Sequence, residues 1–231
     1  MKNHLKRIAA PRTWQIDRKG APFIVRPNPG AHSFYLGLPL GVLLRDFLQK
    51  ARTMTEVKKL LQQNEVLVDG KRRKDHQFLV GLFDVIALPS LKEYYRIMLD
   101  QKGRITPLQI SEKDAEKKIC KVVGKKTLPQ GKVQLQFHDG KTILFEKPVR
   151  VGDSILFRLP SLEPQEIVPL QPGALVFLSQ GKHGGDLGTL KEIKGKEAVY
   201  VLDGKEIDTA TAYLFAVGSK EAKIQVSAGK S

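Results

Sequence analysis

The sequence predicts an α+β protein of several domains, with mostly β structure after a short helical region. The chain has 231 residues, of which 41% are hydrophobic, and domains typically hold roughly 100 to 150 residues, so we expect more than one core. A helical apolar period occurs between residues 40 and 61. Beyond residue 64, short runs rich in β-branched and aromatic residues alternate with glycine-containing turns, a pattern typical of strands.

The first 38 residues are expected to form an extended basic arm. They contain four prolines and show no sustained period of 2 or 3.6. Residues 1–30 hold seven Lys or Arg and one Asp, a net charge of +6. Basic segments with scattered aromatic rings often become ordered only on nucleic acid, and Trp14 and Phe23 offer rings that stack on a base or fill a groove. The alternative is a solvated, disordered leader.

Residues 39–90 are expected to form a small domain of two helices followed by strands. Six apolar residues have the spacing of one helix face: Leu40, Leu43, Leu44, Phe47, Leu48 and Ala51. Three others form a polar stripe on that helix: Arg45, Gln49 and Arg52. Thr53 and Glu56 have the spacing of a capping box for a second helix, which Asn64 ends. Lys58 and Lys59 face outward on it.

The stretch VLVDGKRRKDHQF, residues 66–78, predicts a strand, a tight turn at Asp69 and Gly70, and four consecutive cations, Lys71 to Lys74. Gly70 is free to adopt a positive φ there. Cations held rigidly on a folded scaffold can match the phosphate spacing of folded RNA without the ordering cost of a tail. The segment FDVIALP predicts the next strand. The alternative for the four cations is an ordinary solvated turn.

The rest of the chain is expected to be mainly β. Residues 91–169 predict a β-rich central domain, with strands around Gly103, a hairpin around Gly140 and a short helix capped by Ser111 within SEKDAEKKICKVV. Residues 170–218 alternate short strands with glycine turns, as in a small barrel. Residues 219–231 predict a frayed basic tail. The sequence leaves open whether the central and C-terminal parts pack as one body.

Charge and cysteine content limit the partners and the compartment. The chain has 39 Lys+Arg against 24 Asp+Glu, a net charge of +15, so nucleic acid, an anionic membrane surface or an acidic protein are candidate partners. Cys120 is the single cysteine, which excludes an internal disulfide and fits a reducing compartment. No segment approaches the ~18 apolar residues of a membrane span or has the form of a signal peptide. We expect a soluble, cytoplasmic protein.

No pattern predicts catalysis. Gly140, Lys141 and Thr142 resemble the end of a phosphate-binding loop, but Leu135 stands where that motif needs glycine. The glycines between residues 181 and 188 do not have dinucleotide-binding spacing. The five histidines are scattered singly, and one cysteine cannot build a thiolate zinc site. We therefore expect no catalytic residue, no metal, no cofactor and no small-molecule substrate.

Three stretches carry a resemblance to known proteins. LGVLLRDFLQKARTMTEVKKLLQQNEVLVDGKRRKD resembles an S-four-type RNA-binding domain, a helix-helix-strand module. GALVFLSQGKHGGDLGTL is similar to the KOW motif of small SH3-like barrels. With HLKRIAAPRTWQIDRKG at the start, the order of parts resembles the S-four-e family of archaeal and eukaryotic small-subunit ribosomal proteins over nearly the full length.

This resemblance implies a structural and assembly constituent of the small ribosomal subunit, without catalytic activity, that binds ribosomal RNA beside neighbouring ribosomal proteins. The short chain is similar to archaeal members. The residues expected to contact RNA are His4, Lys6, Arg7, Trp14, Arg18, Lys19, Arg45, Lys50, Arg52, Lys58, Lys59, Lys71, Arg72, Arg73, Lys74, Lys182 and His183.

Two rival functions share these modules. An RNA-modifying enzyme such as a pseudouridine synthase also carries an appended S-four-type domain, but it needs a catalytic Asp in an Arg-Leu-Asp context. The nearest strings here, FRLPS and IMLDQ, do not contain it. A KOW-bearing transcription factor would bind polymerase and would not need the module at residues 40–88.

Overall fold

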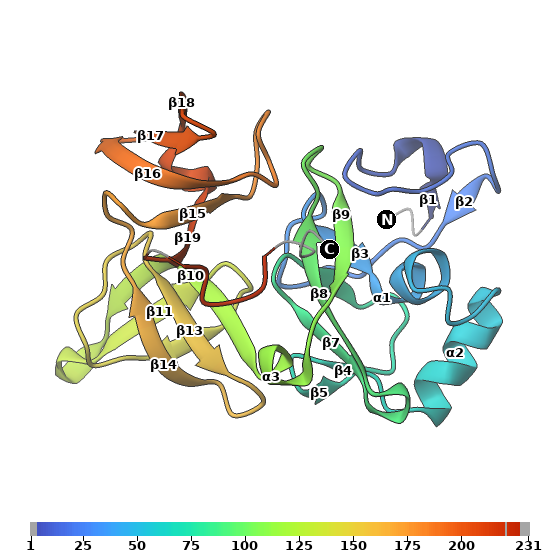
Figure 1. Cartoon of the computed structure of the whole chain (residues 1–231). Coiled ribbons are helices and arrows are strands. Elements are labelled where there is room, and N and C mark those ends of the chain that lie inside the picture. Colours follow the sequence, from blue (N-terminus) through green and yellow to red (C-terminus); the bar gives the residue numbers. More distant parts are fainter. Residues whose placement is uncertain (1–3, 220, 227–231) are drawn as a thin grey trace. The chain divides into compact units, whose positions relative to one another are not determined.

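The computed structural model describes residues 4–219 and 221–226 and divides into two compact units (Figure 1). Unit 1 contains the chain up to Met98 together with Arg104–Ala115. Unit 2 contains Leu99–Gly103 and the chain from Glu116 onward. Within the described part of the chain, every helix is too short or too polar to cross a membrane.

The N-terminal segment of unit 1 is packed, so the prediction of an extended arm is wrong for residues 4–38. Strand β1 (Leu5–Lys6) pairs with β2 (Phe23–Ile24), and the short 3-10 helix η1 (Arg7–Ala9) follows β1. The Trp14 side chain is 2% exposed, and its Nε1 donates a hydrogen bond to the Gly37 carbonyl at 2.8 Å. The buried Trp14 ring therefore holds the segment against the rest of unit 1. The polar composition of the segment gave no sign of this packing.

The first predicted helix is shorter than expected and partly widened. Helix α1 (Leu40–Val42) continues into a π-helical turn, η2 (Leu43–Phe47), in which the Leu48 N–H donates to the Leu43 carbonyl at 2.9 Å. Gln49 has a φ of 51°, a left-handed conformation that ends the helix. The predicted polar stripe is therefore wrong, because Gln49 and Arg52 lie beyond the helix.

Helix α2 (Met54–Gln63) confirms its predicted signals. The Thr53 side chain accepts the Glu56 N–H at 3.2 Å, and the Glu56 carboxylate accepts the Thr53 N–H at 3.3 Å. These two bonds form the predicted capping box. Asn64 is the C-cap, and Val57 and Leu61 are buried.

The main sheet of unit 1 has the strand order β5-β4-β7-β8-β9. Its strands are β4 (Leu67–Val68), β5 (Lys71–Arg72), β7 (Val85–Leu88), β8 (Glu93–Leu99) and β9 (Ile105–Gln109). Strand β3 (Gly37–Pro39) pairs separately with β6 (Leu79–Gly81), the 3-10 helix η3 (Pro89–Leu91) joins β7 to β8, and α3 (Glu112–Ala115) ends the unit. The predicted turn at Gly103 is confirmed, with a φ of 69°.

The predicted helix within SEKDAEKKICKVV is only partly confirmed. Ser111 Oγ accepts the Asp114 N–H at 3.3 Å, as expected for a cap, but the helix ends at Ala115. The second half forms the first part of β10 (Lys117–Thr127) in unit 2. Its Ile, Cys and Val side chains favour a half-buried strand more than a helix.

Unit 2 contains two five-stranded antiparallel sheets. The first has the order β12-β11-β10-β13-β14, with β11 (Val133–Phe137), β12 (Thr142–Leu144), β13 (Ser154–Arg158) and β14 (Glu163–Val168); η4 (Pro129–Gly131) joins β10 to β11. Its core includes Cys120, Val122, Phe137 and Phe157. The predicted hairpin around Gly140 is confirmed by the β11–β12 pairing.

The second sheet has the order β18-β17-β16-β15-β19. It consists of β15 (Leu175–Leu178), β16 (Leu187–Lys194), β17 (Glu197–Leu202), β18 (Lys205–Ala210) and β19 (Leu214–Gly218), with η5 (Thr211–Tyr213) before the last strand. Tyr200 and Leu190 lie in its core. Alternating strands and glycine turns are confirmed, whereas closure into an SH3-like barrel stays a prediction.

Buried contacts join the two sheets of unit 2, a question that the sequence left open. Lys121 Nζ on β10 donates to the carbonyls of Ala212 and Leu214, each at 2.7 Å. Burial lowers the pKa of Lys121 to about 8, so the ammonium is still charged at neutral pH. The rings of His138 and Phe215 also meet edge to face, with centroids 4.8 Å apart.

The described part of the C-terminal segment is docked. Ile224 and Val226 are buried, and Lys223 Nζ lies 3.1 Å from Glu166 Oε1. The predicted frayed tail is therefore wrong for residues 221–226, because these two apolar side chains find a site in unit 2. The remainder of the predicted tail, residues 227–231, lies outside the described residues, as does position 220.

Candidate nucleic-acid interface

The cationic turn of unit 1 is rigidly built. Asp69 and Gly70 have φ values of 51° and 74°, the pair of positive φ angles that a tight two-residue hairpin requires. Asp69 Oδ1 accepts the Val85 N–H at 3.1 Å, and the Arg73 N–H donates to the Val66 carbonyl at 2.9 Å. These bonds fix β4 and β5 on the sheet, so the cations that follow Gly70 have a defined backbone.

Helix α2 adjoins this turn and adds two lysines. Arg72 Nη2 donates to the Gln62 carbonyl at the end of α2, at 3.1 Å. The pKa of His76 is lowered, first by burial and then by the charge of Lys58, which places that lysine near the segment after β5. We call the exposed cations of these elements the α2–β5 surface: Lys58, Lys59, Lys71, Arg72 and Lys74.

The α2–β5 surface lacks counter-ions among residues 4–219 and 221–226, because none of its five cations forms an ion pair there. Arg73, the remaining cation of the turn, is half-buried and packs against the protein. Its guanidinium carbon lies 4.2 Å from the centroid of the Phe78 ring, and its Nε is buried. Arg73 therefore anchors the turn by packing, while its neighbours remain available to phosphates.

Two predicted RNA contacts on the preceding segment are paired within the protein. Arg45 Nε lies 2.6 Å from Asp46 Oδ1, and this hydrogen bond raises the pKa of Arg45. Lys50 Nζ lies 2.7 Å from Glu93 Oε2 on β8. Both charges are thus paired within the protein, and the contacts of Arg45 and Lys50 with RNA stay a prediction. Arg52, beyond the helix, is exposed.

The predicted N-terminal contacts fall into two groups. Trp14 is buried in unit 1, so of its two predicted roles, stacking on a base is wrong. Arg18 donates to four backbone carbonyls between Arg7 and Pro11, at 2.8 to 3.3 Å, and Arg7 Nη1 donates to the Asp17 carbonyl at 2.8 Å. These two arginines hold their own segment together. The exposed members are His4, Lys6 and Lys19.

Lys182 and His183 lie in unit 2, in the loop between β15 and β16. Lys182 is exposed, whereas His183 Nδ1 lies 3.2 Å from Asp186 Oδ2. They belong to a different compact unit from the α2–β5 surface. Their part in RNA binding therefore stays a prediction.

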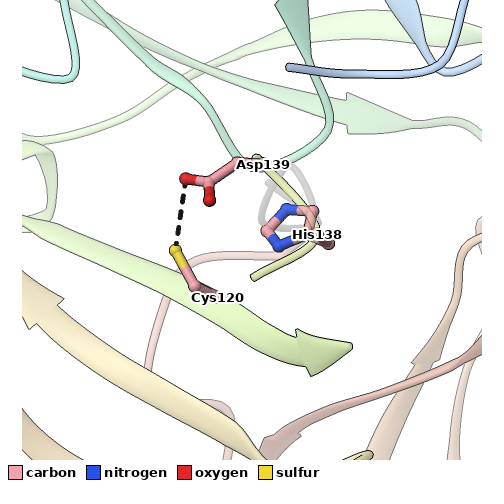
Figure 2. A group of neighbouring side chains, drawn as sticks. All are labelled: Cys120, His138 and Asp139. Atoms are coloured by element: carbon pink, nitrogen blue, oxygen red, sulfur yellow. Dashed lines mark hydrogen bonds between the residues drawn. The ribbon is translucent and has the colours of Figure 1, made fainter. Parts of the chain in front are cut away.

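The structure also brings together three side chains that sequence reasoning treated singly. Cys120 on β10 and His138 and Asp139 after β11 have potential ligand atoms within 4.8 Å of one another. Figure 2 shows the Asp139 carboxylate turned toward the Cys120 sulfur, which lies 3.5 Å from Asp139 Oδ2. The alternation of side chains along β10 is the signal that puts Lys118 and Cys120 on one face.

The chemistry of this group favours an ion-pair network over a metal site. Asp139 Oδ2 lies 3.0 Å from Lys118 Nζ and 2.8 Å from Lys141 Nζ. The Lys121 N–H donates to His138 Nδ1 at 3.3 Å. A metal ion would have to displace two ammonium groups from the carboxylate. Burial alone would raise the pKa of Asp139, but Lys118 and Lys141 hold it well below its ordinary value of 3.8.

Asp139 should therefore stabilise unit 2 at neutral pH and lose this effect in acid. Because its pKa is lower in the folded chain, its contribution is complete above about pH 4 and falls as the pH drops below that value. Asp139→Asn should lower the free energy of unfolding by about 3 kcal/mol at pH 7. Urea unfolding at pH 7 and pH 3 should show a smaller difference for this variant than for the original chain.

Asp208→Asn, at an exposed aspartate on β18, is the matched control for this measurement. It should leave the free energy of unfolding at pH 7 within about 0.5 kcal/mol of the original. Equal stability of Asp139→Asn and Asp208→Asn at pH 7 would contradict the role of the buried ion pairs.

Comparison with known proteins places this arrangement in a family. Residues 91–163 match the ribosomal family S4e, and residues 1–34 match the RS4NT (NUC023) domain. The small ribosomal subunit protein eS4 of Methanocella arvoryzae is 39% identical over 229 residues, 96% of this chain and 97% of that protein. The eS4 protein of Archaeoglobus fulgidus is 40% identical over 224 residues, 94% of each chain.

A solved structure agrees with these relatives. The crystal structure of the 30S ribosomal protein S4e from Thermoplasma acidophilum matches with a TM-score of 0.71 and 28% identity, over 83% of this chain and 99% of that chain. The sequence similarity extends over both compact units and includes the α2–β5 surface. The chain therefore belongs to the ribosomal S4e family.

Proposed function

We propose that this protein is a structural constituent of the small ribosomal subunit and binds the ribosomal RNA of that subunit. The observation that carries the proposal is the near-full-length similarity to proteins named small ribosomal subunit protein eS4. The similarity to these two relatives covers 94 to 96% of the chain, so the proposal does not depend on one module. The neighbours in such a subunit are ribosomal RNA and other ribosomal proteins.

The α2–β5 surface supports RNA as the direct partner. Lys58 and Lys59 lie on a capped helix, and the other three cations follow a tight hairpin turn, so their backbone is ordered before binding. Phosphate contacts from ordered elements fix the position of a protein on RNA at a low entropic cost. We propose the exposed cations Lys6, Lys19, Arg52 and Lys182 and the exposed ring of His4 as further contacts.

Binding to small-subunit ribosomal RNA is expected to weaken steeply with salt. Each neutralised phosphate releases condensed counterions and contributes roughly 0.7 to 0.9 to the slope of log affinity against log salt concentration. A filter-binding or fluorescence titration at several salt concentrations measures this slope. In cells, the tagged protein should sediment with small ribosomal subunits on a sucrose gradient. A slope near zero, or a protein confined to the light fractions, would contradict the proposal.

A further inference from the structure

A second concentration of positive charge lies in unit 2, on the sheet that contains β10, β11 and β12. Residues 121–151 contain seven Lys or Arg and two acidic residues, a net charge of +5. Residues 187–213, which form most of the other sheet of unit 2, contain four Lys or Arg and five acidic residues, a net charge of −1. The positive charge of this unit is therefore concentrated in residues 121–151.

The pairing register shows which side chains point away from the core. Lys126 on β10 pairs with Gln134 on β11, which pairs with Leu144 on the edge strand β12. The adjacent row contains Leu135, which is 1% exposed and belongs to the core of the sheet. Because successive side chains alternate between faces, Lys126 and Gln134 lie on the outer face.

Two further cations, Lys147 and Arg150, lie in the segment between β12 and β13. Lys125 Nζ donates to the Val149 carbonyl at 3.4 Å, and the Gly152 N–H donates to the Val122 carbonyl at 2.9 Å. These bonds hold residues 149–152 beside β10. Lys147 and Arg150 are exposed on this segment, and Lys132 is exposed between η4 and β11.

We call these four exposed cations the β10–β12 surface: Lys126, Lys132, Lys147 and Arg150. Within the described ranges, none of them forms an ion pair. On the other sheet, by contrast, Lys191 pairs with Glu206, and Lys194 Nζ lies 3.1 Å from Glu192 Oε2. Cations without counter-ions create a positive field that attracts a polyanion.

We propose that the β10–β12 surface is a second RNA-binding site, which holds the sugar-phosphate backbone of the ribosomal RNA. The cations would neutralise phosphates, and the amide groups of Gln134 and Gln136 on the outer face would donate hydrogen bonds to phosphate oxygens or 2′-hydroxyls. The proposal rests on the proposed function and extends it to unit 2. In the sequence, this second site is indicated by the absence of acidic residues from Lys117 to His138.

Charge reversal tests this site in the full-length chain. The variant Lys126→Glu, Lys132→Glu, Lys147→Glu changes three exposed lysines of the β10–β12 surface. The matched control Lys191→Glu, Lys194→Glu, Lys196→Glu changes three exposed lysines of the other sheet by the same total charge. Since the two variants have equal net charge, a difference in RNA binding reports the position of the charges.

The β10–β12 variant is expected to bind small-subunit ribosomal RNA at least ten-fold more weakly than the control at about 0.1 M salt. Its salt slope should be smaller by about 2, roughly 0.7 to 0.9 for each lost phosphate contact. Circular dichroism and urea unfolding show whether both variants remain folded. Equal affinity and equal slope for the two folded variants would overturn the proposal.

A tethered cleavage reagent provides a readout that does not depend on these substitutions. Cys120 is the single cysteine of the chain and is 1% exposed, so a cysteine introduced by Gln134→Cys is the accessible thiol. An iron chelate attached there should cleave bound ribosomal RNA by hydroxyl radicals. The same chelate attached through Thr189→Cys, an exposed position on β16, should cleave elsewhere or weakly.

The outcomes separate this inference from the proposed function. Failure of the original chain to bind ribosomal RNA would overturn the proposed function itself. Normal RNA binding by the chain, with no cleavage from position 134, would overturn the second site alone. If the β10–β12 variant binds RNA normally but no longer enters small subunits, the surface contacts an acidic protein instead, and the proposal is overturned.

Discussion

Trp14→Ala is expected to lower the free energy of unfolding by about 3 to 5 kcal/mol and to release the N-terminal segment of unit 1. The indole ring is 2% exposed and its N–H is bonded to the Gly37 carbonyl, so the substitution removes a large buried ring and one hydrogen bond. Urea unfolding measures the loss. Limited trypsin digestion should then cut faster at Arg12 and Arg18 than it does in the original chain.

Trp14→Phe is the matched control for this variant. It keeps most of the apolar ring and loses the bond to Gly37, so it should be destabilised by less than Trp14→Ala and should keep the segment protected from trypsin. Trp14 is also the single tryptophan, so the fluorescence of the free protein should be that of a buried indole. Emission typical of solvent-exposed tryptophan would contradict the packed segment.

Reversing three lysines of the α2–β5 surface is expected to reduce RNA binding strongly without unfolding the chain. The variant is Lys58→Glu, Lys71→Glu, Lys74→Glu, all at exposed positions. It leaves the Arg72 bond to Gln62 and the packing of Arg73 on Phe78 intact. Affinity for small-subunit ribosomal RNA should fall at least ten-fold at about 0.1 M salt, and the salt slope should fall by about 2.

The variant Lys191→Glu, Lys194→Glu, Lys196→Glu again supplies the control of equal charge. It should retain RNA affinity and incorporation into small subunits. Unchanged incorporation of a folded α2–β5 variant would show that the four-cation turn is only a solvated turn. Charge reversal at Arg73 would be a less clear test than at the three lysines, because the Arg73 guanidinium packs on Phe78.

Predictions based on local patterns were the most successful. The capping box at Thr53 and Glu56, the helix end at Asn64 and the turns at Gly70 and Gly140 depend on residues a few positions apart. Their geometry is set by short side-chain bonds and by the freedom of glycine. The predicted length of the first helix was wrong, because a π-helical turn interrupts the regular α-helix and Gln49 ends it with a left-handed conformation.

The candidate site was only partly predictable. The four-cation turn is apparent in the sequence, but the charge of a side chain does not show whether a partner neutralises it. Lys50 meets Glu93 across 43 positions, and Arg18 meets backbone carbonyls that no pattern marks. Whether a cation is available to bind phosphate therefore depends on contacts between segments that are distant in the sequence.

The sequence by itself determined the family, the positive charge, the second helix and the hairpin turns, because each of these depends on composition or on neighbouring residues. Only the tertiary structure decided that Trp14 is buried, that Asp139 gathers Lys118, Lys141 and Cys120, and that Ile224 and Val226 dock in unit 2. The physical reason is that burial and ion pairing depend on chain segments far apart in sequence, which meet only when the strands pair and the sheets pack.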